Sequence, residues 1–298
     1  ELCSKYGLSH RKLGKIIVAA DAEETKEIDR LYHQGKEKGV DDLIFLTRAE
    51  IKRLEPNVEA VAGFLSPSTG IIDVYGLIQS LYGRARENGV DFVFNAEVIE
   101  IDKMANGFNV GVKQANSVYS LNTTIVINAA GLYADKVAAL AGIDIQKANY
   151  RIYYCKGEYF GVNPRLRRVV SRLIYPVPEQ AGTGIHISLN MEGDIKLGPS
   201  ARYVDAIDYH IDETSKTDFY RAAHRYLPVI QMDDLTPDFA GIRPKLQGPD
   251  ETFRDFVIAD ESGKGLPGLV DLIGIESPGL TASPAIARYI RGLLERQM

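Results

Sequence analysis

The apolar run TTIVINAAG, residues 123–131, constrains the fold of this chain more than any other stretch. Its side chains do not alternate between polar and apolar, and it ends in two alanines and a glycine. A strand without alternation is typically buried on both faces, as in a parallel sheet between layers of helices. We therefore expect a continuous buried strand over 123–131, followed by a short helix over 134–141, in an α/β domain.

A second strand–turn–helix unit closes the chain. The stretch DLIGIESPGLTASPAIARYI, residues 271–290, begins apolar, passes through Ser-Pro-Gly at 277–279 and continues in a helical pattern. The first turn of a helix has four N–H groups without intrahelical partners, and its dipole is positive at that end. Such a turn attracts an anion or a carbonyl oxygen, so it is a candidate ligand site. A plain strand-to-helix turn is the alternative interpretation.

The middle of the chain has a different pattern. From about residue 148 to 256 the sequence alternates, as in YRIYYCKGEYFGV and GIHISLN, which predicts an antiparallel sheet with one exposed face. One helix, over 214–226, interrupts it. We therefore expect an α/β (α+β) protein with two interleaved domains. They are a parallel-sheet domain of residues 71–147 and 257–298 and a mostly antiparallel domain of residues 1–70 and 148–256.

The segment from Gly70 predicts local structure in more detail. Asp73 is a candidate N-cap for a helix that Gly89 ends. Strands are expected next, at 91–94 (DFVF), 96–101 and 107–113. Before this segment, strand-like runs at 15–20 and 43–47 alternate with helical patterns at 22–38 and 48–54.

Composition excludes several classes of function. The net charge of -5 gives no basic surface for nucleic acid. No apolar run approaches the roughly 18 residues that a transmembrane segment needs. The two cysteines, Cys3 and Cys155, are too far apart in sequence for a zinc motif or a disulfide framework, so we expect no metal site. Unpaired thiols fit a reducing cytoplasm, with peripheral association at a membrane as an alternative.

Four stretches, in this order along the chain, carry a family resemblance. Together they resemble the D-amino-acid-oxidase-like (DAO) family of FAD-dependent oxidoreductases, and within it the L-2-hydroxyglutarate dehydrogenase branch. The resemblance implies FAD as cofactor, hydride transfer to FAD from a small 2-hydroxy acid, a small carboxylate substrate and an electron-acceptor partner. The stretches are TGIIDVYGLIQSLYGRARENGVDFVFNAEV, VINAAGLYAD, GIHISLNMEGDIKLGPSARYV, and AGIRPKL with GIESPGLTASPAIARYI.

One departure from the family pattern matters for the cofactor. The family opens with a strand, a GxGxxG turn and a helix that cradle the FAD pyrophosphate. The run KIIVAA near the start of this sequence matches a later part of that pattern. The resemblance therefore implies an FAD/NAD(P)-binding-like domain without its first strand and helix, interleaved with a substrate domain. A non-catalytic fragment, or one component of a split flavoprotein, remains an alternative.

The resemblance also implies which residues contact the cofactor. The small residues that end the 123–131 strand would lie against FAD, and the 274–281 turn would face the flavin ring, with backbone N–H donors at its helix start. A valine in the strand at 96–101 would bracket the adenine through its backbone. The expected cofactor residues are Val98, Ala129, Ala130, Gly131, Gly274, Pro278, Gly279, Leu280 and Thr281.

Three residues are candidates for the substrate site. Arg243, in GIRPK, would bind the substrate carboxylate, since a guanidinium binds a carboxylate in bidentate fashion. His186, in GIHISL, would accept the hydroxyl proton, because imidazole titrates near neutral pH. Tyr175 would close the site over the carboxylate. A salt-bridged arginine, a histidine bonded to a backbone carbonyl and a packing tyrosine are the alternatives. An amine or amino-acid oxidase, or a glycerol-3-phosphate dehydrogenase, is the alternative function.

Overall fold

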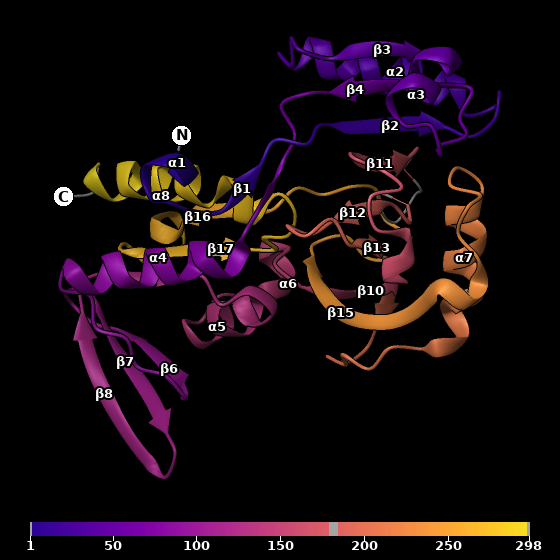
Figure 1. The fold of residues 1–298 in the computed structure, drawn as a ribbon. Helices are drawn as coiled ribbons and strands as arrows, with labels where there is room; N and C mark the ends of the chain where they lie inside the picture. Colours follow the sequence, from indigo (N-terminus) through magenta and orange to yellow (C-terminus); the bar gives the residue numbers. More distant parts are fainter. Residues whose placement is uncertain (1, 179–183, 297–298) are drawn as a thin grey trace. The chain divides into compact units, whose positions relative to one another are not determined.

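The computed structural model describes residues 2–178 and 184–296 (Figure 1). The chain divides into two compact units. Unit 1 comprises Glu1–Asp91, Gly157–Arg202 and Tyr209–Gly241. Unit 2 comprises Phe92–Lys156, Tyr203–Asp208 and Ile242–Met298.

The unit boundaries differ from the domain boundaries expected from composition. Residues 71–91 lie in unit 1 rather than with the parallel strands, and residues 148–156 and 242–256 lie in unit 2. The physical reason is that two long strands, β10 (Tyr153–Val162) and β15 (Leu235–Lys245), contain residues of both units. The sequence composition does not change at a boundary that lies inside a continuous strand, so composition does not reveal that boundary.

The largest sheet in the described part of the chain has nine strands. Their order is β14-β10-β13-β12-β11-β2-β4-β3, with β15 also paired to β10. The β2–β11 pair is parallel, whereas β10–β13, β12–β13, β11–β12, β2–β4 and β3–β4 are antiparallel. The remaining strands of this sheet are β2 (Lys15–Ala19), β3 (Ile44–Thr47), β4 (Ala62–Ser66), β11 (Leu173–Pro176), β12 (Ile187–Leu189), β13 (Ile195–Leu197) and β14 (Arg202–Val204).

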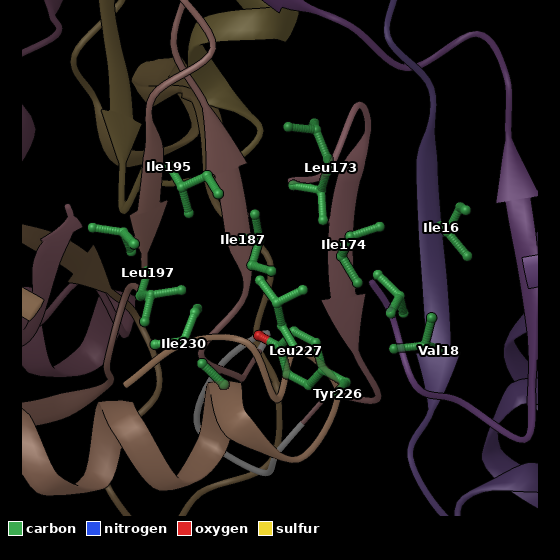
Figure 2. Close-up of a cluster of buried hydrophobic side chains, with 14 of the residues drawn as sticks. Ile16, Val18, Leu173, Ile174, Ile187, Ile195, Leu197, Tyr226, Leu227 and Ile230 are labelled. Atoms are coloured by element: carbon green, nitrogen blue, oxygen red, sulfur yellow. The ribbon is translucent and has the colours of Figure 1, made fainter. Parts of the chain in front are cut away.

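One face of this sheet carries the main core of unit 1. Alternate residues of neighbouring strands point to the same side, so Ile16, Val18, Ile174, Ile187 and Leu197 converge in one cluster (Figure 2). Each is buried, and burying a side chain of this size stabilises the fold by about 1.5–3 kcal/mol. The cluster is completed by residues after α7 (Lys216–His224), namely Tyr226, Leu227 and Ile230.

Helix caps in unit 1 follow the sequence signals. Thr47 and Glu50 form a capping box at the start of α3, and the Asp73 carboxylate accepts a hydrogen bond from Gly76 N at 3.0 Å at the start of α4. The cap predicted at Asp73 is therefore confirmed. The other elements of unit 1 are α1 (Leu2–Lys5), α2 (Thr25–Glu37), α3 (Arg48–Leu54), α4 (Val74–Glu87), β1 (His10–Arg11), β5 (Ile71–Ile72), and the 3₁₀ turns η2 (Pro164–Leu166), η3 (Glu213–Ser215) and η4 (Met232–Asp234).

Unit 2 contains two three-stranded sheets, in the orders β6-β7-β8 and β16-β17-β9. In the second, β17 runs parallel to β9 and antiparallel to β16. The elements are β6 (Ala96–Lys103), β7 (Phe108–Gln114), β8 (Ser117–Thr123), β9 (Val126–Asn128), η1 (Gly131–Tyr133), α5 (Ala134–Leu140), α6 (Ile145–Ala148), β16 (Val257–Asp260), η5 (Glu261–Lys264), β17 (Leu269–Ile273) and α8 (Gly279–Glu295).

Strand β17 is the strand of unit 2 that is buried on both faces. Leu269 and Ile273 belong to a cluster that includes Ala134 and Ala138 of α5, whereas Val270 packs in a second cluster with residues of α8. All five residues of β17 are buried. The physical argument for an unalternating strand between two helical layers therefore applies to β17.

The same argument was wrong for residues 123–131. Thr123 is the last residue of β8, and of the rest only Val126–Asn128 form a strand, in which Ile127 is 47% exposed. Within the described residues β9 pairs with β17 alone, so its other side has no strand to cover it. The strand predicted at 91–94 is also wrong, since these residues have no regular secondary structure. None of the described helices is both long enough and apolar enough to cross a membrane.

Candidate functional site

Asn128 organises the small-residue turn after β9. It lies opposite Asp271 in the parallel register of β9 and β17. Its side-chain amide donates hydrogen bonds to Asp271 Oδ1 and to Ala134 O, both at 2.7 Å. Its Oδ1 accepts a hydrogen bond from Ala130 N at 3.2 Å. One buried side chain therefore fixes the turn 129–131, joins it to β17 and binds the start of α5.

A buried acidic pair lies beside this turn. Asp271 and Glu261 are both fully buried, and Glu261 accepts a hydrogen bond from Tyr150 Oη at 2.7 Å and pairs with Lys264. Among the described residues, Asp271 Oδ2 is a buried side-chain oxygen without a hydrogen-bond partner. Burial raises the pKa of Asp271 to about 7, with a further rise from Glu261 that the hydrogen bond from Asn128 opposes. A protonated carboxyl explains how this oxygen tolerates burial.

The turn after β17 is held in one conformation by packing and by an ion pair. Gly274 has a φ of +71°, and a Cβ at this position would lie 2.5 Å from the Cγ of Leu246. Only glycine satisfies both conditions. Two residues on, Glu276 binds Lys245 Nζ at 2.9 Å, with side chains that are 15% and 10% exposed. This pair ties the turn to the end of β15 within unit 2.

The N-terminus of α8 is open to an electron-rich group. The helix begins at Gly279 after Pro278, and no side chain caps it. Gly279 is buried, whereas Pro278, Leu280 and Thr281 are exposed. An uncapped, exposed helix start presents backbone N–H groups and a positive dipole end. The 17-residue length of α8 gives it a full set of aligned peptide dipoles.

The Ala-Ala-Gly turn has open space beside it. Ala129 and Ala130 are exposed. A Cβ added to Gly131, which has a φ of +57°, would meet no atom within 4 Å. Close packing of the strand against the helix would have buried these residues. The turn instead offers a small, accessible backbone surface that a flat ligand can approach closely.

Two further candidates in unit 2, Val98 for the cofactor and Arg243 for the substrate carboxylate, lie on strands. Val98 is 36% exposed and lies on β6, an edge strand, next to a β-bulge between Val98 and Glu100. One side of the β6 backbone is therefore not used for pairing in its sheet. Arg243, on β15, is partly buried, and its guanidinium donates to the sulfur of the buried Cys155 at 3.6 Å.

The substrate candidates of unit 1 form a direct pair. Tyr175 on β11 and His186, which directly precedes β12, stack with ring centroids 3.7 Å apart and planes inclined by 16°. His186 is 7% exposed, and its Nδ1 lies 3.2 Å from Gly184 O. Burial raises the pKa of Tyr175 to about 12, with a smaller contribution from Tyr159. The Tyr175 hydroxyl is therefore a proton-bearing donor at neutral pH.

The described residues form neither a second dinucleotide cradle nor a metal cluster. The string GKGLPG at 263–268 fits the GxGxxG spacing, but it leads from η5 into strand β17 instead of into a helix. It therefore lacks the helix N-terminus that a dinucleotide cradle requires. Over residues 2–178 and 184–296, no cluster of three or more His, Cys, Asp or Glu side chains could hold a metal ion.

The parallel strands β9 and β17, each followed by a small-residue turn, are typical of the class of proteins that bind nucleotide cofactors. The family model described as FAD dependent oxidoreductase matches residues 1–293. This chain belongs to that family, the DAO family, as its motifs predicted. It is an oxidoreductase family that uses FAD.

Individual relatives narrow the comparison. The mitochondrial L-2-hydroxyglutarate dehydrogenase of Arabidopsis thaliana is 33% identical over 97% of this chain and 67% of its own length. A glycerol 3-phosphate dehydrogenase of Caloramator mitchellensis is 27% identical, and the chain spans 59% of its length. The L-α-glycerophosphate oxidase of Mycoplasma pneumoniae, solved with FAD bound, superposes with a TM-score of 0.83 at 27% identity, over 97% of this chain and 74% of that one.

The residues present in unit 2 fit an FAD cofactor on two observations. A Cβ at Gly131 would meet no atom within 4 Å, and the start of α8 is uncapped and exposed. Sequence reasoning found these residues but missed Asn128, Lys245 and Glu276 as the groups that hold the turns. Their partners lie far away in sequence, so no local pattern reveals them.

Proposed function

We propose that this protein oxidises a small 2-hydroxy acid, with L-2-hydroxyglutarate as the first substrate to test. The relatives named L-2-hydroxyglutarate dehydrogenase support this choice, and the plant protein is 33% identical to this chain. The single structural observation that carries the proposal is the buried imidazole of His186 stacked on Tyr175. A 2-hydroxy acid must lose a hydroxyl proton, and this pair offers a base beside a hydroxyl donor.

On the cofactor side, Ala129, Ala130 and Gly131 would lie against FAD, and the 274–281 turn would present its backbone N–H groups to it. Val98 would contribute a backbone contact. When bound, FAD supplies the acceptor for the hydride of the substrate carbon. A helix start stabilises negative charge that grows at its N–H groups, and this stabilisation needs no reorganisation during the reaction.

On the substrate side, His186 would hold the hydroxyl proton. If Nδ1 donates to Gly184 O, the basic lone pair of the ring is on Nε2. Arg243 would bind the carboxylate next to the hydroxyl, since its planar guanidinium matches a carboxylate. Tyr175 would donate a hydrogen bond and shield the imidazole from water on the face that it stacks on.

Flavin reduction under anaerobic conditions tests this proposal. The FAD-loaded chain should lose its absorbance near 450 nm, the usual band of oxidised flavin, on addition of L-2-hydroxyglutarate. His186→Ala should slow this reduction at least about tenfold, and Arg243→Lys should raise the KM for the acid about tenfold or more. His33→Ala, at an exposed position on α2, is the matched histidine control. An unchanged reduction rate in His186→Ala would remove His186 from the mechanism.

A second candidate substrate is glycerol 3-phosphate. It is favoured by the similarity to the Caloramator mitchellensis protein and by the TM-score with the Mycoplasma pneumoniae oxidase. It also carries a hydroxyl next to an anionic end. A substrate panel of L-2-hydroxyglutarate, glycerol 3-phosphate, glycine and sarcosine separates these candidates by which one reduces the flavin.

A further inference from the structure

The sheet of unit 1 has a second face opposite its main core, where Ile17 and Ala19 of β2 belong to a smaller apolar cluster with Phe64 of β4. On β2, Ile16 and Val18 point into the core, so Lys15 points to the other side. On β11 the neighbour of Ile174, Tyr175, points the same way as Lys15, because β2 and β11 pair in parallel register. The same alternation places His186 there, one residue before the start of β12.

Lys15 lies directly over the Tyr175 ring. Its Nζ is 5.0 Å from the centroid of the ring, and the same ring stacks on His186 at 3.7 Å. Strands β2 and β12 flank β11, so the ammonium and the imidazole reach one aromatic ring from the two neighbouring strands. A cation over an aromatic face is held in place by the negative quadrupole of the ring.

Lys15 has no counterion in the part of the chain that the structure describes, residues 2–178 and 184–296. Its contact with Tyr175 is a cation–π contact, and neither a hydrogen bond nor an ion pair accompanies it. The side chain is partly buried, and desolvation lowers its pKa. A partly desolvated ammonium with no carboxylate gains more from an added anion than a fully hydrated one does.

We propose that Lys15 is a specificity-determining residue that binds the distal carboxylate of a dicarboxylic 2-hydroxy acid. The inference rests on the proposed function, and it narrows the substrate from 2-hydroxy acids in general to those with a second anionic end. One aromatic ring separates the Lys15 ammonium from the His186 imidazole. A five-carbon dicarboxylate has its hydroxyl near one end and its second carboxylate at the other, and in this proposal His186 takes the proton of the first group while Lys15 binds the second.

Binding of glutarate tests the role of Lys15 without turnover. Glutarate has both carboxylates but no hydroxyl to oxidise. In calorimetric titrations of the FAD-saturated chain, Lys15→Met should weaken glutarate binding by about 10- to 100-fold and leave pentanoate, with one carboxylate, unchanged. Lys15→Arg should retain most of the glutarate affinity. Lys12→Met, the same substitution at an exposed position, is the matched control.

Turnover then separates this inference from the proposed function. In flavin reduction, Lys15→Met should raise the KM for L-2-hydroxyglutarate and leave the KM for 2-hydroxypentanoate unchanged. An equal loss on both acids, or wild-type chain that does not bind glutarate, would overturn the role of Lys15. If glutarate binds through Lys15 but neither acid reduces the flavin, the oxidation of 2-hydroxy acids fails while the anion site stands. A circular-dichroism melt of each variant identifies any effect that comes from unfolding.

Discussion

Each unit contains a buried aspartate, Asp234 in unit 1 and Asp271 in unit 2, and the two carboxylates have opposite surroundings. In unit 1 the Asp234 carboxylate, 4% exposed, receives two hydrogen bonds from Arg165 at 2.6 and 2.7 Å. Glu55, 2% exposed, likewise meets Arg172 at 3.0 Å. In unit 2 the fully buried Asp271 bonds to the neutral Asn128 and lies near a second acid.

This difference shifts the pKa values of Asp234 and Asp271 in opposite directions. Desolvation raises the pKa of Asp234, but the hydrogen bonds from Arg165 and from Gln231 N outweigh it and hold the pKa below its usual value. The pKa of Asp271 is instead raised to about 7. At slightly acid pH, Asp234 is therefore ionised and Asp271 is protonated. The charge of the partner, and not burial as such, decides the outcome.

The largest expected effect is the pH dependence from Asp271. Its folded-state pKa of about 7 exceeds the unfolded value of about 3.9, so its contribution is fully present below about pH 4 and is lost as pH rises through about 7. The upper limit of this loss is on the order of 4 kcal/mol. Asp271→Asn, which cannot ionise, should abolish it. Urea unfolding of both proteins between pH 4 and 8 measures the difference, and parallel curves would contradict it.

A smaller effect on stability is expected when Asp234 of unit 1 loses its cationic partner and so resembles Asp271 of unit 2. Arg165→Met leaves Asp234 buried without its cation and should cost about 2 kcal/mol at pH 7. The loss should shrink as the pH falls and Asp234 takes up a proton. Arg167→Met is the matched control, because Arg167 and Asp194 form a pair whose side chains are 43% and 27% exposed. That control should cost less than about 1 kcal/mol in the same urea unfolding experiment. Equal costs in the two variants would mean that burial of the carboxylate does not matter.

The smallest effect is expected for a carboxylate that binds backbone alone. Asp73 caps α4 through Gly76 N, and Asp73→Ala should cost about 1 kcal/mol. Asp73→Asn retains an N-capping oxygen, so it should lower the free energy of unfolding by only about 0.3 kcal/mol. Thermal unfolding followed by circular dichroism compares the two variants. If Asp73→Ala destabilised the protein as much as Arg165→Met does, the free energy of unfolding would not depend on how deeply the carboxylate is buried.

Much of the local structure could be predicted from the sequence. The sequence pattern predicted α3, the Asp73 cap and helical spacing predicted α4, and the small residues at 129–131 and 274–279 marked the turns that follow β9 and β17. The eleven-residue strand β15 was missed, since Pro237, Pro244 and a run of exposed residues hide its pattern. Strand β8 was missed for a similar reason, because most of its side chains are exposed.

The sequence by itself determined the family, the FAD cofactor of that family and the identity of the two turns, because these depend on residue types at short spacing. Only the tertiary structure decided that Asn128 bonds to Asp271, that Tyr175 stacks on His186 and that Lys15 lies over that same ring. Each of these pairs depends on which strands are neighbours and in which register they pair. Strand register over long separations is set by the packing of the whole sheet, so no local pattern in the chain contains it.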